Sequence, residues 1–236
     1  NCIEKEHKDS DLSKQYIQKK AYKYAREISA ELTYPMVVFL VSFFNWIFKK
    51  VYKKIRIYNL EKIIPLTGDY EVVFLPCHRS HMDYILLGQV MFAQGFTPVH
   101  TAAGINLNFW PTGTILRKAG AFFIRRTFSA NLLYKTVFSE YVDFLIRDGY
   151  PMCFYMEGGR SRDGYLRSPR TGLLSMVQRS HQRHPSKKVL LVPIYVGYDR
   201  IIEGLTYFHE VSGKKKQTES FSNFIKLAAS FFHKNN

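Results

Sequence analysis

Short apolar runs alternate with longer helical stretches from about residue 70 onward. The expected strands are residues 71–76, 97–101, 119–124, 151–156 and 189–196, and the expected helices are residues 82–93, 131–146 and 172–182. Strands that alternate with helices indicate βαβ units and a largely parallel sheet. The apolar runs lack polar alternation, which is typical of strands covered on both faces. We therefore predict an α/β fold with a largely parallel sheet and flanking helices.

A helical region precedes this part of the chain. Residues 4–31 are charged and rich in helix formers, residues 32–48 carry no charge, and a basic cluster occupies residues 49–56. The uncharged run is slightly shorter than the roughly 20 residues that a spanning helix needs. An apolar aromatic segment beside a basic cluster favours a helix that lies in the surface of an anionic membrane leaflet. A buried core helix and a true span are the two alternatives.

These patterns divide the chain into three segments. Residues 1–66 form the helical N-terminal segment and residues 67–213 form the α/β domain. Residues 214–236 hold a basic loop and the start of a helix near Ser220. The sequence starts without Met and without a secretory pattern, so we expect it to be part of a longer protein.

Charge narrows the choice of partners. The 34 Lys and Arg residues exceed the 19 Asp and Glu residues, which gives a formal net charge of +15 and indicates anionic partners. A nucleic-acid-binding module is one such interpretation. It predicts aromatic residues interleaved with Lys and Arg on one surface, whereas most Phe and Tyr residues here lie inside apolar runs. The three Cys residues form no CxxC pair, and no metal-ligand spacing is present, so we expect neither a metal site nor a cofactor.

His78 and Asp83 follow the expected strand 71–76 directly. Sites in parallel α/β sheets gather at the carboxyl ends of strands. An Asp can hold one ring nitrogen of a His while the other nitrogen removes a proton from a hydroxyl. His81 competes for this role, but Leu86, not Asp, stands five residues after it.

Several classes of enzyme lack support in this sequence. A GxSxG nucleophile, a Walker phosphate loop and a GxGxxG fingerprint are all absent from the chain. A His–Asp pair without a protein nucleophile indicates that the attacking hydroxyl belongs to the substrate.

Two further strand ends are basic. Arg126 ends the run Gly120–Arg126, and a strand-end Arg suits a bound phosphate because its guanidinium forms a bidentate fork. The segment 154–162 places Glu157, Gly158, Arg160 and Ser161 after the next strand. Acceptors for hydroxyls beside guanidinium groups suit a polyol phosphate. A surface Arg pair and an ordinary basic turn are the alternatives.

The segments His78–Asp83, Gly120–Arg126, Phe154–Ser161 and Val192–Pro193 together resemble four blocks of the glycerol-3-phosphate/lysophosphatidate acyltransferase superfamily, in the same order. Gly159 and Met156 stand where many relatives have Thr and Pro. Both variants resemble the bacterial glycerol-3-phosphate branch of the superfamily.

This resemblance implies a glycerolipid acyltransferase fold and transfer of an acyl group from acyl-CoA or acyl-carrier protein to the sn-1 hydroxyl of glycerol 3-phosphate. It implies His78 as general base, Asp83 as its orienting partner, and Pro193 as the mark of the fourth block. The residues implied to bind glycerol 3-phosphate are Arg126, Glu157, Gly158, Arg160 and Ser161.

The implied location is the cytoplasmic face of a bacterial inner membrane, with peripheral or monotopic attachment. Lysophosphatidate acyltransfer is the nearest alternative activity. No nucleic-acid partner is expected.

Overall fold

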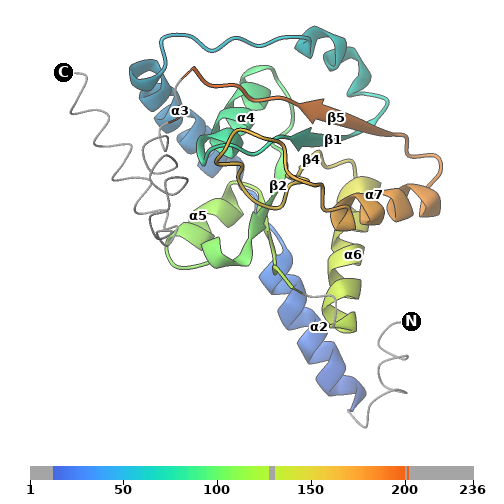
Figure 1. Cartoon of the computed structure of the whole chain (residues 1–236). Helices are drawn as coiled ribbons and strands as arrows, with labels where there is room; N and C mark the ends of the chain where they lie inside the picture. Colours follow the sequence, from blue (N-terminus) through green and yellow to red (C-terminus); the bar gives the residue numbers. More distant parts are fainter. Residues whose placement is uncertain (1–12, 128–130, 200, 202–236) are drawn as a thin grey trace.

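The computed structural model describes residues 13–127, 131–199 and 201, and Figure 1 shows their arrangement. In this part of the chain one sheet contains β1 (Glu71–Pro76), β2 (His100–Gly104), β3 (Ala121–Ile124), β4 (Met152–Cys153) and β5 (Val189–Ile194). The strand order is β3-β2-β4-β1-β5, and every pairing is parallel. The predicted parallel α/β sheet is confirmed.

The helices flank this sheet. They are α2 (Lys14–Ile28), α3 (Tyr34–Val51), α4 (Met82–Ala93), α5 (Thr112–Lys118), α6 (Leu132–Arg147) and α7 (Gly172–Arg183), with short 3-10 turns η1 (Leu60–Lys62), η2 (Ile64–Leu66) and η3 (Ile105–Leu107). The side chain of Asn131 accepts a hydrogen bond from the backbone N–H of Tyr134 at 2.9 Å and so caps α6. The expected helix start at residue 131 is therefore the N-cap itself.

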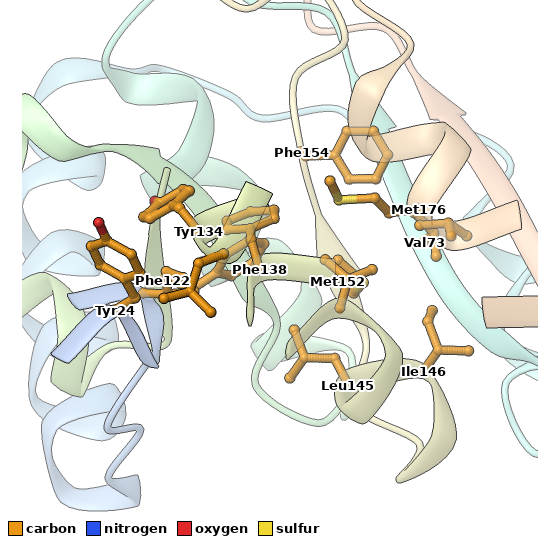
Figure 2. Close-up of a cluster of buried hydrophobic side chains, with 14 of the residues drawn as sticks. Tyr24, Val73, Phe122, Tyr134, Phe138, Leu145, Ile146, Met152, Phe154 and Met176 are labelled. Carbon is orange, nitrogen blue, oxygen red and sulfur yellow. The ribbon is translucent and has the colours of Figure 1, made fainter. Parts of the chain in front are cut away.

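Alternate residues of β1 pack into two hydrophobic clusters, one on each face of the sheet. Val73 packs with α2, α6 and α7 in the larger core, whose side chains Figure 2 shows around Phe122, Phe138 and Met152. Val72 and Phe74 point to the other face and pack with α4. Helices on both faces explain why apolar and polar residues do not alternate along β1.

Four of the five predicted strands differ in extent from the observed ones, and the strands expected at 97–101 and 151–156 differ most. The strand expected at 97–101 is observed at His100–Gly104, because Pro98 has no N–H to donate to a sheet ladder. The strand expected at 151–156 pairs only at Met152–Cys153 before the chain enters a loop. The sequence analysis missed α5, a short helix that contains Gly113. Residues 214–216 and the helix expected near Ser220 lie outside the described residues.

Helix α3 contains most of the uncharged run 32–48 and has two different faces. Phe48 is buried with Met82 of α4, whereas Phe39, Phe43 and Trp46 are exposed to 63%, 45% and 55%. A helix buried on all sides, one of the two alternatives, is therefore excluded. Over the residues that the structure describes, no helix has both the length and the apolar character needed to cross a membrane.

Candidate active site

The turn between β1 and α4 holds His78 against Asp83. The Nδ1 atom of His78 lies 2.9 Å from Oδ2 of Asp83, whose side chain is fully buried. The same oxygen accepts the backbone N–H groups of Arg79 at 2.6 Å and Ser80 at 2.9 Å. Because an ionised carboxylate only accepts hydrogen bonds, Nδ1 of His78 carries a proton, and in a neutral imidazole Nε2 then has the free lone pair. The two predicted partners are in contact, and Nδ1 rather than Nε2 faces the carboxylate.

His81 lies in a different environment, although it is only three residues away. Burial and then the positive charge of Arg160 lower the pKa of His81 to about 3. Its ring packs edge-on against Tyr84 at a centroid distance of 6.2 Å. A histidine with so low a pKa is a weak base near neutral pH. The burial of His81 thus argues against the competing candidate.

Glu157 connects the two loops of the site. Its Oε1 accepts the backbone N–H of His78 at 2.8 Å, and its Oε2 accepts that of Arg167 at 3.1 Å. The backbone N–H of Ser161 donates to the carbonyl of His78 at 2.7 Å. Both carboxylate oxygens of Glu157 therefore hold the backbone in place, a role that the sequence analysis did not foresee.

Gly158 and its neighbours shape the loop after β4. The φ angle of Gly158 is +61°, and a Cβ there would lie 2.7 Å from Cδ of Arg170, so a side chain would be strained and would require Arg170 to move. Arg160 and Ser161 are both buried, and the hydroxyl of Ser161 donates to Asp163 at 3.0 Å. The predicted loop residues do gather beside His78.

Arg126 lies apart from this cluster in the strand order. It follows β3 at the edge of the sheet, and β2 lies between β3 and β4. The Arg126 and Arg160 blocks therefore follow strands that are not neighbours in the sheet, although β3 and β4 are consecutive in the sequence. Both strands nevertheless end at the same side of a parallel sheet. The Arg126 side chain is exposed.

Arg125, which the sequence analysis assigned no role, is firmly held. Its guanidinium forms a bidentate ion pair with Glu27 of α2 at 2.6 and 2.7 Å. The hydrogen bond to Glu27 is the main cause of the raised pKa of Arg125. The rings of Tyr24 and Tyr134 lie 5.0 and 4.7 Å from the guanidinium carbon. Arg125 thus fastens the end of β3 to α2, directly before Arg126.

Two tyrosines complete the surroundings of the His78–Asp83 pair. The Tyr155 ring stacks on the His78 ring with centroids 4.1 Å apart, and burial raises the pKa of Tyr155 well above its ordinary value. The hydroxyl of Tyr198 donates to Oδ1 of Asp83 at 2.6 Å. The sequence analysis did not identify either tyrosine. The one feature that could have indicated them is that they follow β4 and β5, at the carboxyl ends of the strands.

Pro193 belongs to β5, an edge strand, where it is paired in register with Leu75. An edge position suits a residue without an N–H donor.

The acyltransferase family model matches residues 54–197, more than half of the chain. The chain belongs to the acyltransferase family. The matched range contains the His78–Asp83 pair and both basic strand ends, and Tyr198 is the first residue after it.

Similar proteins carry more specific names. The chain is 46% identical over 221 residues to the glycerol-3-phosphate acyltransferase of Aeromonas hydrophila, and 46% identical over 220 residues to that of Shewanella halifaxensis. Each match covers 93% of this acyltransferase chain, which spans only 27% of either relative. A crystal structure of the 1-acyl-sn-glycerophosphate acyltransferase of Thermotoga maritima is 14% identical, covers 76% of this chain and 92% of that chain, and gives a TM-score of 0.37.

Proposed function

We propose that this chain transfers an acyl group from acyl-CoA or acyl-carrier protein to the sn-1 hydroxyl of glycerol 3-phosphate. The observation that carries the proposal is the buried Asp83, which holds Nδ1 of His78 and leaves Nε2 able to accept a proton. The relatives that carry the name glycerol-3-phosphate acyltransferase support the choice of acceptor.

The reaction follows from this geometry. Nε2 of His78 removes the hydroxyl proton while the substrate oxygen forms a bond to the thioester carbonyl carbon. The resulting tetrahedral intermediate collapses, the C–S bond breaks, and the thiolate leaves with the proton that His78 returns. Asp83 stabilises the imidazolium between these two steps. The products are lysophosphatidate and the free thiol of the donor.

The acceptor's phosphate requires positive charge near the base. Arg126 and Arg160 are proposed to bind it, since both follow strands that end at the carboxyl side of the sheet. Glu157, Gly158 and Ser161 contribute by building the loop that carries Arg160. A guanidinium binds phosphate through paired N–H donors.

The acceptor is tested by acylation assays with radiolabelled acyl-CoA and acyl-carrier protein. We expect label in lysophosphatidate when glycerol 3-phosphate is offered, and little label in phosphatidate when lysophosphatidate is offered. Strong preference for lysophosphatidate would instead support the alternative activity. Loss of the label after His78→Ala would show that the acylation comes from this site.

The partner surface is proposed to be an anionic membrane, at the cytoplasmic face of a bacterial inner membrane. Phe39, Phe43 and Trp46 form an exposed aromatic face on α3, and Nζ of Lys50 lies 4.1 Å from the Trp46 ring centroid. The exposed Lys53, Lys54 and Arg56 follow. Aromatic side chains beside basic ones suit the interface of an anionic leaflet.

Sedimentation with lipid vesicles tests this surface. Binding should require anionic lipid and should weaken as salt screens the basic cluster. Equal binding to neutral and anionic vesicles at every salt concentration would contradict the electrostatic part of the proposal.

A further inference from the structure

The two oxygens of Asp83 are held in different ways. Oδ2 accepts hydrogen bonds from His78, Arg79 and Ser80, all in the turn that leads into α4. Oδ1 accepts the hydroxyl of Tyr198, which comes from the segment after β5, 115 residues away in sequence. Tyr198 is therefore the long-range support of a carboxylate that is otherwise held by its own turn.

The Asp83–Tyr198 contact has the character of a strong hydrogen bond. Its oxygen–oxygen distance is 2.6 Å, in the range of a hydroxyl that donates to an ionised carboxylate. The carboxylate is fully buried. Without the hydroxyl, Oδ1 would be a buried charged acceptor that loses a donor, which is costly in a site of low dielectric.

The Tyr198 ring is positioned by residues of the N-terminal segment. Its centroid lies 6.2 Å from that of Tyr52, and the Tyr52 ring lies 5.7 Å from that of Phe48 on α3. Tyr198 also packs with the cluster of Phe48 and Met82, in which α3 meets α4. The helix with the exposed aromatic face thus supports the residue that holds Asp83.

We propose that Tyr198 is a positioning residue for acyl transfer, which orients Asp83 and through it the His78 ring. Three hydrogen bonds to one oxygen fix that oxygen, but they leave the carboxylate plane able to turn about it. A donor on Oδ1 fixes the plane and with it the direction of the Nδ1–H bond of His78. This inference rests on the proposed function.

The test is steady-state kinetics on the full chain carrying Tyr198→Phe, which removes the hydroxyl and keeps the ring. We expect kcat to fall about ten- to hundredfold, the range for a lost hydrogen bond to a charged group. The KM values for glycerol 3-phosphate and for the acyl donor should stay within about twofold, because the tyrosine touches neither substrate in the proposed arrangement.

Tyr195→Phe is the matched control. It removes the same hydroxyl three residues earlier, from a side chain that is 72% exposed and whose ring packs on Arg79. Its kcat should equal that of the wild type. Unchanged kcat in Tyr198→Phe, or equal losses in the two variants, would overturn the inference.

A double variant separates positioning from a merely structural role. In an Asp83→Ala chain both carboxylate oxygens are gone, so adding Tyr198→Phe should lower kcat no further. This double variant leaves no buried charge without its donor, so it remains informative if the single variant fails to fold. A further loss of the same size in the Ala background would mean that Tyr198 acts independently of Asp83.

Failure of the proposed function looks different. If the wild-type chain acylates no glycerol 3-phosphate, the activity itself is wrong and Tyr198 has no acyl transfer to support. A second outcome is that the wild-type chain is active, His78→Ala is inactive and Tyr198→Phe has wild-type kcat. In that case the proposed function stands and only the positioning role of Tyr198 is wrong.

Discussion

The proposed base follows β1 and a proposed phosphate-binding residue follows β3, and the protein holds these two side chains differently. At the end of β1, His78 is held by Asp83, Tyr155 and the backbone contacts of Glu157, and its side chain is 15% exposed. At the end of β3, Arg126 is exposed while its neighbour Arg125 is fixed to Glu27. A general base gains from a preset orientation, whereas a phosphate-binding side chain has to meet a substrate that enters from solvent.

The largest expected effect comes from removing the base. His78→Ala should lower kcat about 10²–10⁴-fold, the contribution typical of general acid–base catalysis. His81→Ala should cost less than about tenfold, since burial and Arg160 hold the pKa of His81 at about 3 and make it a poor base. Steady-state assays of both folded variants decide this. An inactive His81→Ala beside an active His78→Ala would reverse the assignment.

Removing Arg126 should affect binding and leave the chemical step nearly intact. Arg126→Ala should raise KM for glycerol 3-phosphate roughly tenfold to hundredfold, the cost of one charge-assisted contact. KM for the acyl donor should change little, and Arg126→Lys should restore binding only partly because an ammonium lacks the fork. Kinetics with each substrate varied in turn measure both constants. A folded Arg126→Ala chain with wild-type KM would remove this residue from the acceptor site.

A Glu157 variant tests whether the loop after β1 depends on the hydrogen bonds that Glu157 accepts from the backbone. Glu157→Gln places an amide NH₂ opposite one of the two backbone N–H groups, of His78 or Arg167, that the carboxylate now accepts. The free energy of unfolding should fall by about 1–3 kcal/mol, as for a buried donor left without its acceptor. Urea unfolding followed by circular dichroism measures the change.

Glu140→Gln is the control for this charge removal. Glu140 is exposed and pairs with the exposed Arg183 at 3.0 Å, so its loss should cost less than about 1 kcal/mol. Equal destabilisation by the two variants would mean that Glu157 is not a special support of the site.

The sequence predicted the local parts of this site better than the long-range parts. The limits of β1 and α4 and the pairing of His78 with Asp83 depend on a few neighbouring residues, and the structure reproduces them. The position of β2 between β3 and β4, and the contact of Tyr198 with Asp83, depend on how distant segments pack. Apolar runs identify strands, but they carry no record of strand order.

The smallest expected effect tests whether the fixed Arg125 matters for the exposed Arg126. Glu27→Gln weakens a partly exposed bidentate pair, so it should cost about 1 kcal/mol or less and raise KM for glycerol 3-phosphate up to about fivefold. Glu31→Gln, the same change at an exposed side chain shortly after α2, should leave KM unchanged. If Arg125 acts by holding the end of β3 in place for its neighbour, Glu27→Gln should add nothing to KM in an Arg126→Ala chain. An additional rise there would mean that the α2 contact affects acceptor binding by a route other than Arg126, and the contrast between the two strand ends would then need a second binding residue near β3.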